Sequence, residues 1–263
     1  SSSTVTVDYA TSNRTATASS DYTAASGTLT FSAGQTSKTF NVPVLADTVY
    51  ETGNETVTIT LSNATNATIS DATGILTITD DDNAPTVTLA SSASSVAENG
   101  SDLTLTATLS NATTAAVTVG ISTSGTGTEG TDYATVSDIT ISAGATTGTA
   151  AFNPTDDSVY EGDETGIIAI DTVSGGGATE NSTPQAVTLT ISENESAPTV
   201  SLSSTATTVY DNGSNITFTA TSTVAADEDI TVAISDHTGT ATPGTDFGAI
   251  TSITISAGQT EGT

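Results

Sequence analysis

The sequence contains no cysteine, no methionine and no tryptophan, and only two of its 263 residues are lysine or arginine. Without cysteine the chain can form no disulfide, no thiolate metal site and no cysteine nucleophile. Two bases cannot neutralise a phosphate backbone, so we expect no nucleic-acid partner. The net charge of −28 would be repelled by anionic lipid. No apolar run approaches the roughly 18 to 20 residues of a membrane span, so we expect no membrane insertion in this segment.

Aromatic residues make up only 4% of the chain, whereas threonine and serine account for 61 and 34 residues. Apolar residues alternate with these polar ones and do not form long runs. The clearest series are Leu103, Leu105, Ala107 and Leu109, then Val117, Val119 and Ile121, then Val187, Leu189 and Ile191. A spacing of two is typical of a half-buried strand, and threonine favours strands. No segment shows a sustained 3.6-residue period, so the sequence predicts an all-β protein.

The chain repeats itself at intervals of 110 to 114 residues. The phrase Ser-Ala-Gly follows Phe31, Ile141 and Ile255, and the phrase Ala-Pro-Thr-Val begins at Ala84 and again at Ala197. A short acidic segment precedes each Ala-Pro-Thr-Val phrase. These linkers are short and stiffened by proline, so we expect neighbouring repeats to meet end to end with little freedom of movement.

The repeats divide the chain into three parts. The middle repeat, residues 84–196, is complete; the first repeat, residues 1–83, lacks the opening strands, and the third repeat, residues 197–263, lacks the closing strands. We therefore expect the sequence to be a segment of a longer tandem array. A full repeat carries about seven short strands separated by Gly, Asn and Asp turns. This pattern predicts tandem immunoglobulin-like β-sandwiches with incomplete outer repeats.

Acidic residues collect at the turns of the middle repeat. They are Glu98, Asp132, Asp156, Asp157 and Glu161. Alternate loops of a sandwich lie at the same end, so these carboxylates can converge, and one pair about 5 Å apart repels by roughly 3 kcal/mol at an effective dielectric constant of about 20. A divalent cation removes that repulsion, and Ca²⁺ accepts about six to eight oxygen ligands in flexible geometry. The alternative reading is that the acids only keep the surface solvated.

Several phrases together resemble the Calx-β repeat. The middle repeat has Gly-Thr-Asp-Tyr from residue 130, Ile-Ser-Ala-Gly from residue 141 and Asp-Asp-Ser-Val-Tyr-Glu from residue 156. The first repeat has Ser-Asp-Tyr from residue 20, Asp-Thr-Val-Tyr-Glu from residue 47 and Ile-Thr-Asp-Asp-Asp from residue 78. The resemblance covers essentially the whole chain. It implies an immunoglobulin-like sandwich that can bind Ca²⁺ at one end, in a family found in sodium–calcium exchangers and in long bacterial surface proteins and adhesins.

The resemblance also implies metal ligands, carried over position by position. In the middle repeat they are Glu98, Asp132, Asp156, Asp157 and Glu161; in the first repeat Asp21, Asp47, Glu51, Asp80, Asp81 and Asp82; in the third repeat Asp211 and Asp246. The sequence departs from the pattern at Ala46, which stands where the middle repeat has Asp156, and in the linker Glu193-Asn194-Glu195, which replaces the aspartate triplet. No repeat matches every ligand position, so some sites are expected to be weak or empty.

Nothing in the sequence indicates catalysis. His237 is the only histidine, no nucleophile elbow accompanies it, and we expect it in a loop. Paired carboxylates occur in glycosidases, but those sites lie in aromatic-lined clefts that this chain cannot build. We therefore expect no enzyme. Tyr50 and Tyr160, which precede a candidate glutamate ligand, are expected to pack at a core or an edge and to orient the loop.

These observations favour a Ca²⁺-binding structural segment of a long extracellular or cell-surface protein. In this hypothesis the segment is part of the stalk or extender of an adhesin, its partners are neighbouring repeats of the same chain, and Ca²⁺ at the junctions makes it rigid. One alternative is a subunit of a self-assembling extracellular filament or sheath, in which the partners are other copies of the chain. A second alternative is a regulatory Ca²⁺ sensor domain attached to a membrane transporter.

Overall fold

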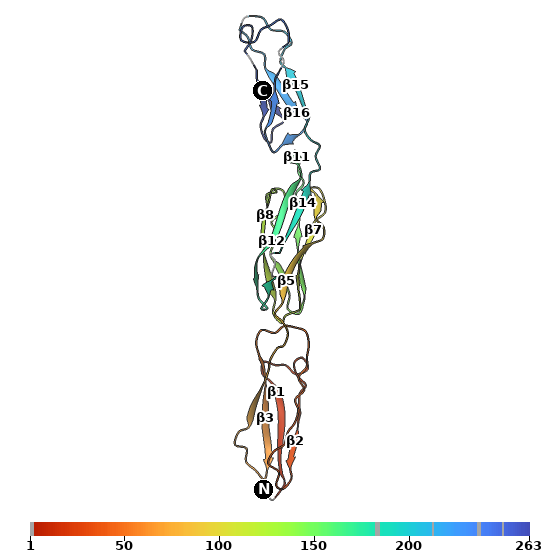
Figure 1. The fold of residues 1–263 in the computed structure, drawn as a ribbon, viewed down its shortest axis with the longest axis vertical. Coiled ribbons are helices and arrows are strands. Elements are labelled where there is room, and N and C mark those ends of the chain that lie inside the picture. The colour runs from red at the N-terminus through yellow and green to blue at the C-terminus, as the bar shows by residue number, and fades with distance from the viewer. Residues whose placement is uncertain (1–2, 182–184, 212, 236–237, 249) are drawn as a thin grey trace.

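The computed structural model describes residues 3–181, 185–211, 213–235, 238–248 and 250–263. These residues form strands and loops, with no helix among them, which confirms the prediction of an all-β fold. It follows that no described segment is a helix long and apolar enough to cross a membrane. Three groups of strands follow one another along the long axis, so the chain is a rod with its N-terminus at one end (Figure 1).

The middle repeat is a sandwich of two sheets. One sheet has the order β10 (Thr147–Phe152), β7 (Leu103–Leu109), β5 (Thr86–Ser91), β13 (Thr179–Glu180). The other has the order β6 (Ser95–Ala97), β14 (Ala186–Ser192), β12 (Glu164–Ser174), β8 (Val117–Gly125), β9 (Ile139–Ile141). Strand pairs are antiparallel except for β13 with β5 and β14 with β6, which are parallel. This is the immunoglobulin-like sandwich that the repeat pattern predicts.

The alternation that predicts the strands also builds the core of the middle repeat. Along β7 the four apolar side chains are buried, and the threonines between them are exposed or half-buried. Leu105 of β7 and Ile168 of β12 come from opposite sheets, and both are fully buried. Tyr133 stacks on Phe152 with 4.8 Å between ring centroids. The buried apolar side chains of this repeat form one continuous core. Burying each large side chain contributes about 1.5–3 kcal/mol.

The first repeat consists of a single sheet. Its order is β2 (Ser26–Phe31), β1 (Val5–Asn13), β3 (Glu55–Thr65), β4 (Thr73–Ile78). No second sheet covers it, so its buried core contains only Ala16, Tyr22 and Val57 among the described residues. Tyr9 compensates in part by stacking on Phe40, with ring centroids 3.9 Å apart.

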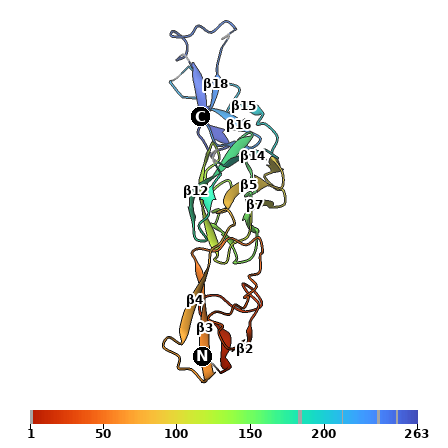
Figure 2. The same ribbon diagram turned by 60° about the horizontal axis from the view of Figure 1, so that its bottom comes forward.

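The third repeat has two small sheets. One contains β15 (Val200–Ser204), β16 (Phe218–Ser222) and β20 (Glu261–Gly262); the other contains β18 (Ile230–Ala233) and β19 (Ser252–Ile255). The described residues of this repeat contain no counterparts of β12 and β14, and Leu202 of β15 is 53% exposed. Within the described residues, each outer repeat thus has fewer strands than the middle repeat. Figure 2 shows β15, β16 and β18 of the third repeat beyond β14.

Adjacent repeats are joined by backbone pairing as well as by the linkers. At the first junction, Tyr50 forms a parallel bridge with Thr113 of the middle repeat. At the second junction, β11 (Val159–Tyr160) pairs in parallel with β17 (Ala225–Ala226) of the third repeat. We expected Tyr50 and Tyr160 to pack at a core or edge and orient the loop. The structure adds a role that the sequence did not indicate, because the backbones of both tyrosines pair with the repeat that follows.

Candidate metal centres

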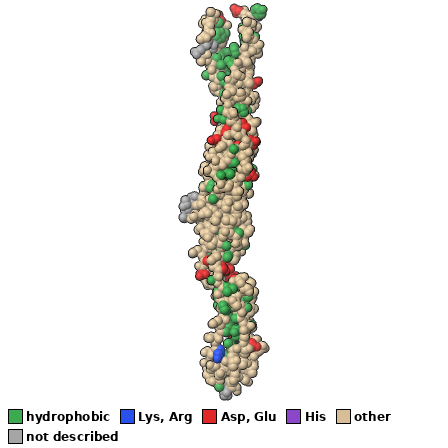
Figure 3. Space-filling model, turned by 90° about the vertical axis from the view of Figure 1, so that its right-hand side faces the viewer, with side chains coloured by type: hydrophobic (Ala, Val, Ile, Leu, Met, Phe, Trp, Pro, Cys, Tyr) green, Lys and Arg blue, Asp and Glu red, His purple; other side chains and the backbone are tan. Residues whose placement is uncertain are grey.

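Acidic side chains gather at two levels of the rod, near the two junctions between repeats (Figure 3). Five groups of three carboxylates have ligand atoms within 4.8 Å of one another among the described residues. Three groups lie at the end of the middle repeat and two at the end of the first repeat. Four of the groups combine residues from loops that are far apart in sequence, whereas Asp80, Asp81 and Asp82 are consecutive.

Asp132, Glu161 and Glu164 form the first group of the middle repeat. Asp132 is 8% exposed, and its Oδ2 caps a turn by accepting a hydrogen bond from the Thr128 N–H at 2.5 Å. The neighbouring Tyr133 anchors this turn in the core. Burial raises the pKa of Glu161 to about 7, with the negative charge of Asp132 as the next cause. Burial, the charge of Asp132 and a hydrogen bond with it raise the pKa of Glu164 to about 7.

Glu98 connects the other two groups of the middle repeat. It belongs to one group with Asp157 and Glu161, and to another with Glu193 and Glu195. Glu98 follows β6 and is only 6% exposed. Its Oε1 accepts a hydrogen bond from the Asp157 N–H at 3.1 Å. Burial raises its pKa even though that hydrogen bond opposes the shift.

Glu193, in the linker that follows β14, connects the linker to the loop after β11 by accepting hydrogen bonds from the N–H groups of Glu161 and Gly162. Burial alone would raise its pKa, but backbone N–H donors from Glu161, Glu195 and Gly162 lower the pKa to about 2. The Glu161 N–H lies 2.5 Å from Glu193 Oε2. In the first repeat the Glu51 N–H donates in the same way to Asp80 Oδ2 at 2.9 Å. The glutamate that replaces aspartate in the middle linker therefore keeps this hydrogen bond.

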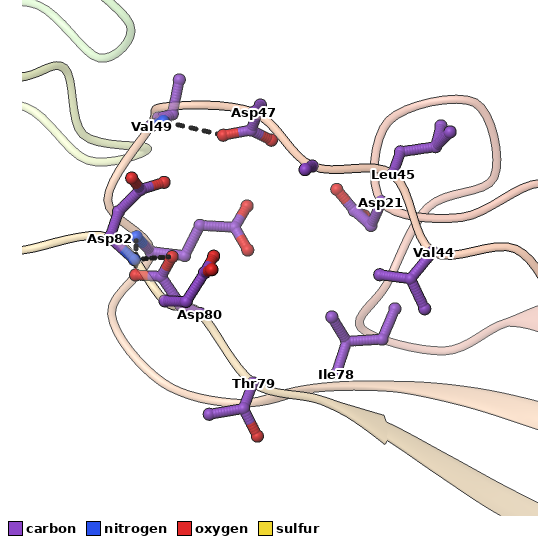
Figure 4. Close-up of a pocket in the computed structure, with 12 residues that line it drawn as sticks. Asp21, Val44, Leu45, Asp47, Val49, Ile78, Thr79, Asp80 and Asp82 are labelled. Atoms are coloured by element: carbon purple, nitrogen blue, oxygen red, sulfur yellow. Dashed lines mark hydrogen bonds between the residues drawn. The ribbon is translucent and has the colours of Figure 1, made fainter.

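The first repeat contributes two groups at its own end. One group is Asp21, Glu51 and Glu55, and the other is Asp80, Asp81 and Asp82. All of these residues except Glu55 line one hollow, which Asp47 also lines (Figure 4). Asp47 Oδ1 accepts a hydrogen bond from the Val49 N–H at 2.7 Å. Its negative charge is among the causes that raise the pKa of Glu51, after burial and Asp21.

Two predicted positions in the third repeat are not brought together with other acids. Asp211 and Asp246 are exposed, and neither belongs to a group of three in the part of the chain that the structure describes. Asp246 forms the same type of turn-capping hydrogen bond as Asp132, because its Oδ2 accepts a hydrogen bond from the Thr242 N–H at 2.7 Å. Asp156 likewise joins no group, and its Oδ1 accepts from Asn194 Nδ2 at 2.7 Å. His237 lies outside the described residues.

Sequence reasoning missed four members of these groups: Glu55, Glu164, Glu193 and Glu195. A signal was present for the first two, since each opens the strand just after the Tyr-Glu pair of its repeat. Their inward position could not be read from the sequence, because it depends on where the Asp-Tyr turn lies against the start of that strand. Glu193 and Glu195 were noted as linker acids but were not assigned as ligands.

The donor set fits a hard divalent cation. Every member of the five groups is a carboxylate. Glu55 Oε2 and Glu195 Oε2 are buried without a hydrogen-bond partner. At about 5 Å separation and an effective dielectric constant of about 20, one pair of ionised carboxylates repels by roughly 3 kcal/mol. Ca²⁺ suits such a set because it takes several carboxylate oxygens in flexible geometry.

Comparison with known proteins identifies the repeat. The Calx-beta domain family matches three segments of the chain: residues 1–82, 80–195 and 193–260. No curated protein matches the sequence.

Among solved structures, the chain is similar to "Crystal structure of CBD12 from CALX1.2", with 20% identity over 65% of this chain and 69% of the other, and a TM-score of 0.30. It is also similar to "Crystal structure of Apo-form Calx CBD1 domain", with 20% identity over 41% of this chain and 98% of the other, and a TM-score of 0.36. The family match covers nearly every residue, and the chain belongs to the Calx-beta domain family, as three tandem copies.

Proposed function

We propose that the chain is a Ca²⁺-binding structural segment of a long extracellular surface protein, serving as part of a stalk or extender. The observation that carries this proposal is the position of the acidic groups. They lie at the ends of the first and middle repeats, where each meets the repeat that follows (Figure 3). A cation bound there would offset the repulsion among carboxylates and hold the junction in one arrangement. The role is mechanical and involves no catalysis.

The backbone connects the candidate sites to the junctions. Glu51 and Glu161 directly follow the tyrosines whose backbone pairs with the next repeat. At the first junction, the Tyr50 N–H donates to the Ala112 carbonyl at 2.8 Å and the Tyr50 carbonyl accepts from the Thr114 N–H at 3.2 Å. Fixing the glutamate would therefore also fix the residue that pairs with the neighbouring repeat.

A filament built from copies of the chain is the second candidate. It is favoured by apolar side chains left exposed on the outer repeats, among them Ile75 at 52% and Leu202 at 53%. In a filament, strands of another copy would cover these faces. Light scattering at rising Ca²⁺ concentration separates the two candidates: a single rod keeps the mass of one chain, whereas a filament gains mass.

Small-angle scattering tests the main proposal. The chelator-treated chain should show a broader range of shapes than the Ca²⁺-bound chain, which should approach a straight rod with a larger maximum dimension. Glu161→Gln should reduce this response, because Glu161 belongs to two of the three middle groups. Asp102→Asn is the matched control, since Asp102 is exposed and belongs to no group. Identical profiles with Ca²⁺ and with chelator would contradict the proposal.

A further inference from the structure

The two junctions have the same backbone architecture. Residues 111–117 of the middle repeat correspond to residues 224–230 of the third repeat. Thr113 bridges Tyr50, and its carbonyl accepts a hydrogen bond from the Gly144 N–H at 2.8 Å. Its counterpart Ala226 pairs with Tyr160, and its carbonyl accepts from the Gly258 N–H at 2.7 Å. The junctions can therefore be compared residue by residue.

The corresponding segments differ in charge. In the middle repeat, the bridged residue Thr113 is followed by Thr114-Ala115-Ala116. In the third repeat, its counterpart Ala226 is followed by Asp227-Glu228-Asp229. Asp227 lies next to the acidic end of the middle repeat, because its N–H donates to the Tyr160 carbonyl at 3.3 Å. Its charge is one of the causes that raise the pKa of Glu164. The segment that follows the bridged residue thus brings negative charge to an acidic end at the second junction, whereas the corresponding segment at the first junction carries no charge.

The junctions also differ in the contacts that hold them without an ion. At the first junction, Asn111 Nδ2 donates to the carbonyl of the linker residue Asn83 at 2.9 Å. Val224 occupies the corresponding position at the second junction and cannot donate this bond. The first junction therefore has, in addition to its backbone bridge, a side-chain hydrogen bond that Val224 cannot form at the second junction.

We propose that the two junctions respond differently to cations: the first stays closed without an ion, and the second closes only when a cation offsets the charge of Asp227 and Glu228. The identity of the ion as Ca²⁺ rests on the proposed function. The first and middle repeats then form one stiff unit at all Ca²⁺ concentrations. The middle and third repeats meet at a joint that Ca²⁺ switches from mobile to fixed. Ca²⁺ in this arrangement controls one particular joint and does not stiffen the whole rod evenly.

Pairs of spin labels can measure each junction separately, because the chain has no native cysteine. Cysteines at the exposed positions Thr60 and Thr108 report on the first junction, and cysteines at Thr188 and Thr231 report on the second. In chelator, pulsed electron resonance should give a narrow distance distribution across the first junction and a broad one across the second. Saturating Ca²⁺ should narrow only the second distribution. Equal responses at the two junctions would overturn the proposal.

Exchanging the charges provides matched variants. Asp227→Thr combined with Glu228→Ala installs the residues found at the first junction, and should narrow the second distribution in chelator. Thr114→Asp combined with Ala115→Glu should broaden the first distribution in chelator and make it narrow again with Ca²⁺. Both variants change exposed or half-buried side chains and leave the backbone hydrogen bonds of the junction in place. If the distance distribution across the second junction stays broad in chelator after the acids are removed, the proposal is contradicted.

A salt control separates this inference from the proposed function. If calorimetry shows no Ca²⁺ binding to the native chain, the proposed function fails, but repulsion at the second junction can still be measured. At about 1 M salt the screening length is about 3 Å, which suppresses repulsion between exposed charges. In chelator, such salt should narrow the second distribution and leave the first unchanged. If the chain binds no Ca²⁺ and the distance distribution across the second junction also does not respond to salt, the inference is overturned as well.

Discussion

Strands β5 and β15 occupy the same place in two copies of one repeat, yet their side chains lie in opposite environments. Val87 and Leu89 of β5 are 0% and 7% exposed, whereas their counterparts Val200 and Leu202 of β15 are 40% and 53% exposed. The local pattern is the same, so the difference comes from the strands opposite. In the middle repeat β12 and β14 pack against β5, and the described residues of the third repeat contain no counterparts of these two strands. The alternating pattern forms the strand, and the second sheet supplies the burial.

The largest expected effect tests this difference directly. Leu89→Ala should destabilise the middle repeat by about 2 to 5 kcal/mol, because it leaves a cavity in a closed core. Leu202→Ala should change the stability of the third repeat by no more than about 0.5 kcal/mol, because that side chain is already exposed. Urea unfolding followed by amide hydrogen exchange assigns each change to its repeat. Equal costs at the two positions would mean that the third repeat is closed in solution.

Ca²⁺ should stabilise the middle repeat and leave the third unchanged. The middle repeat contains three acidic groups, and none is found among the described residues of the third. With a dissociation constant of about 10⁻⁴ M, about 10 mM Ca²⁺ adds roughly 2.7 kcal/mol to the free energy of unfolding. Thermal unfolding with Ca²⁺ or with chelator measures the shift, and Mg²⁺ serves as the control ion. Equal stabilisation of both repeats would show that the ion acts elsewhere.

The pH dependence of stability in the metal-free chain should distinguish the middle repeat from the third. The pKa values of Glu161 and Glu164 are raised to about 7 in the folded state, mainly by burial. Between about pH 4.5 and 7 the folded middle repeat holds protons that the unfolded chain has released, so its stability falls as the pH rises through this window. Melting temperatures in chelator at pH 5 and pH 7.5 measure the effect.

The double variant Glu161→Gln with Glu164→Gln is the control for this pH effect, and its melting temperature should change less between the two pH values. Glu193 contributes with the opposite sign at lower pH. Its pKa is lowered to about 2, so its contribution is present above about pH 4.5 and is lost as the pH falls toward 2. A native chain that becomes more stable from pH 5 to 7.5 in chelator would argue against buried, repelling glutamates.

The smallest expected effect on stability concerns two aspartates with the same hydrogen bond. Asp132 and Asp246 both cap a turn, but only Asp132 lies among other carboxylates. Asparagine can still cap the turn, so Asp132→Asn and Asp246→Asn should each change metal-free stability by less than about 1 kcal/mol. Ca²⁺ affinity should fall about tenfold or more in Asp132→Asn and remain unchanged in Asp246→Asn. Calorimetric titration of both variants checks this contrast.

Much of the fold follows from the sequence because its determinants are local. The alternation from Leu103 to Leu109 predicts β7 and its buried face, and the recurring Ser-Ala-Gly phrase predicts the repeat length.

The candidate sites were only partly predictable because they depend on contacts between distant loops. The order of acids along the chain indicates Asp132 and Glu161, but only the folded structure places Glu164 beside them. Asp211 and Asp246 match the family pattern in sequence, yet the fold brings no other carboxylates to them within the described residues. The parallel bridge of Tyr50 has no sequence signal of its own, since a single bridged residue has no periodicity.

Calorimetric titration of Ca²⁺ into the chelator-stripped chain is the decisive test of Ca²⁺ binding at the junctions. We expect saturable binding at micromolar to millimolar Ca²⁺ that Mg²⁺ does not reproduce. Binding should be weakened by Glu161→Gln and unchanged by Asp102→Asn. If no binding occurs at millimolar Ca²⁺, the acids at the junctions are not metal ligands and only solvate the surface.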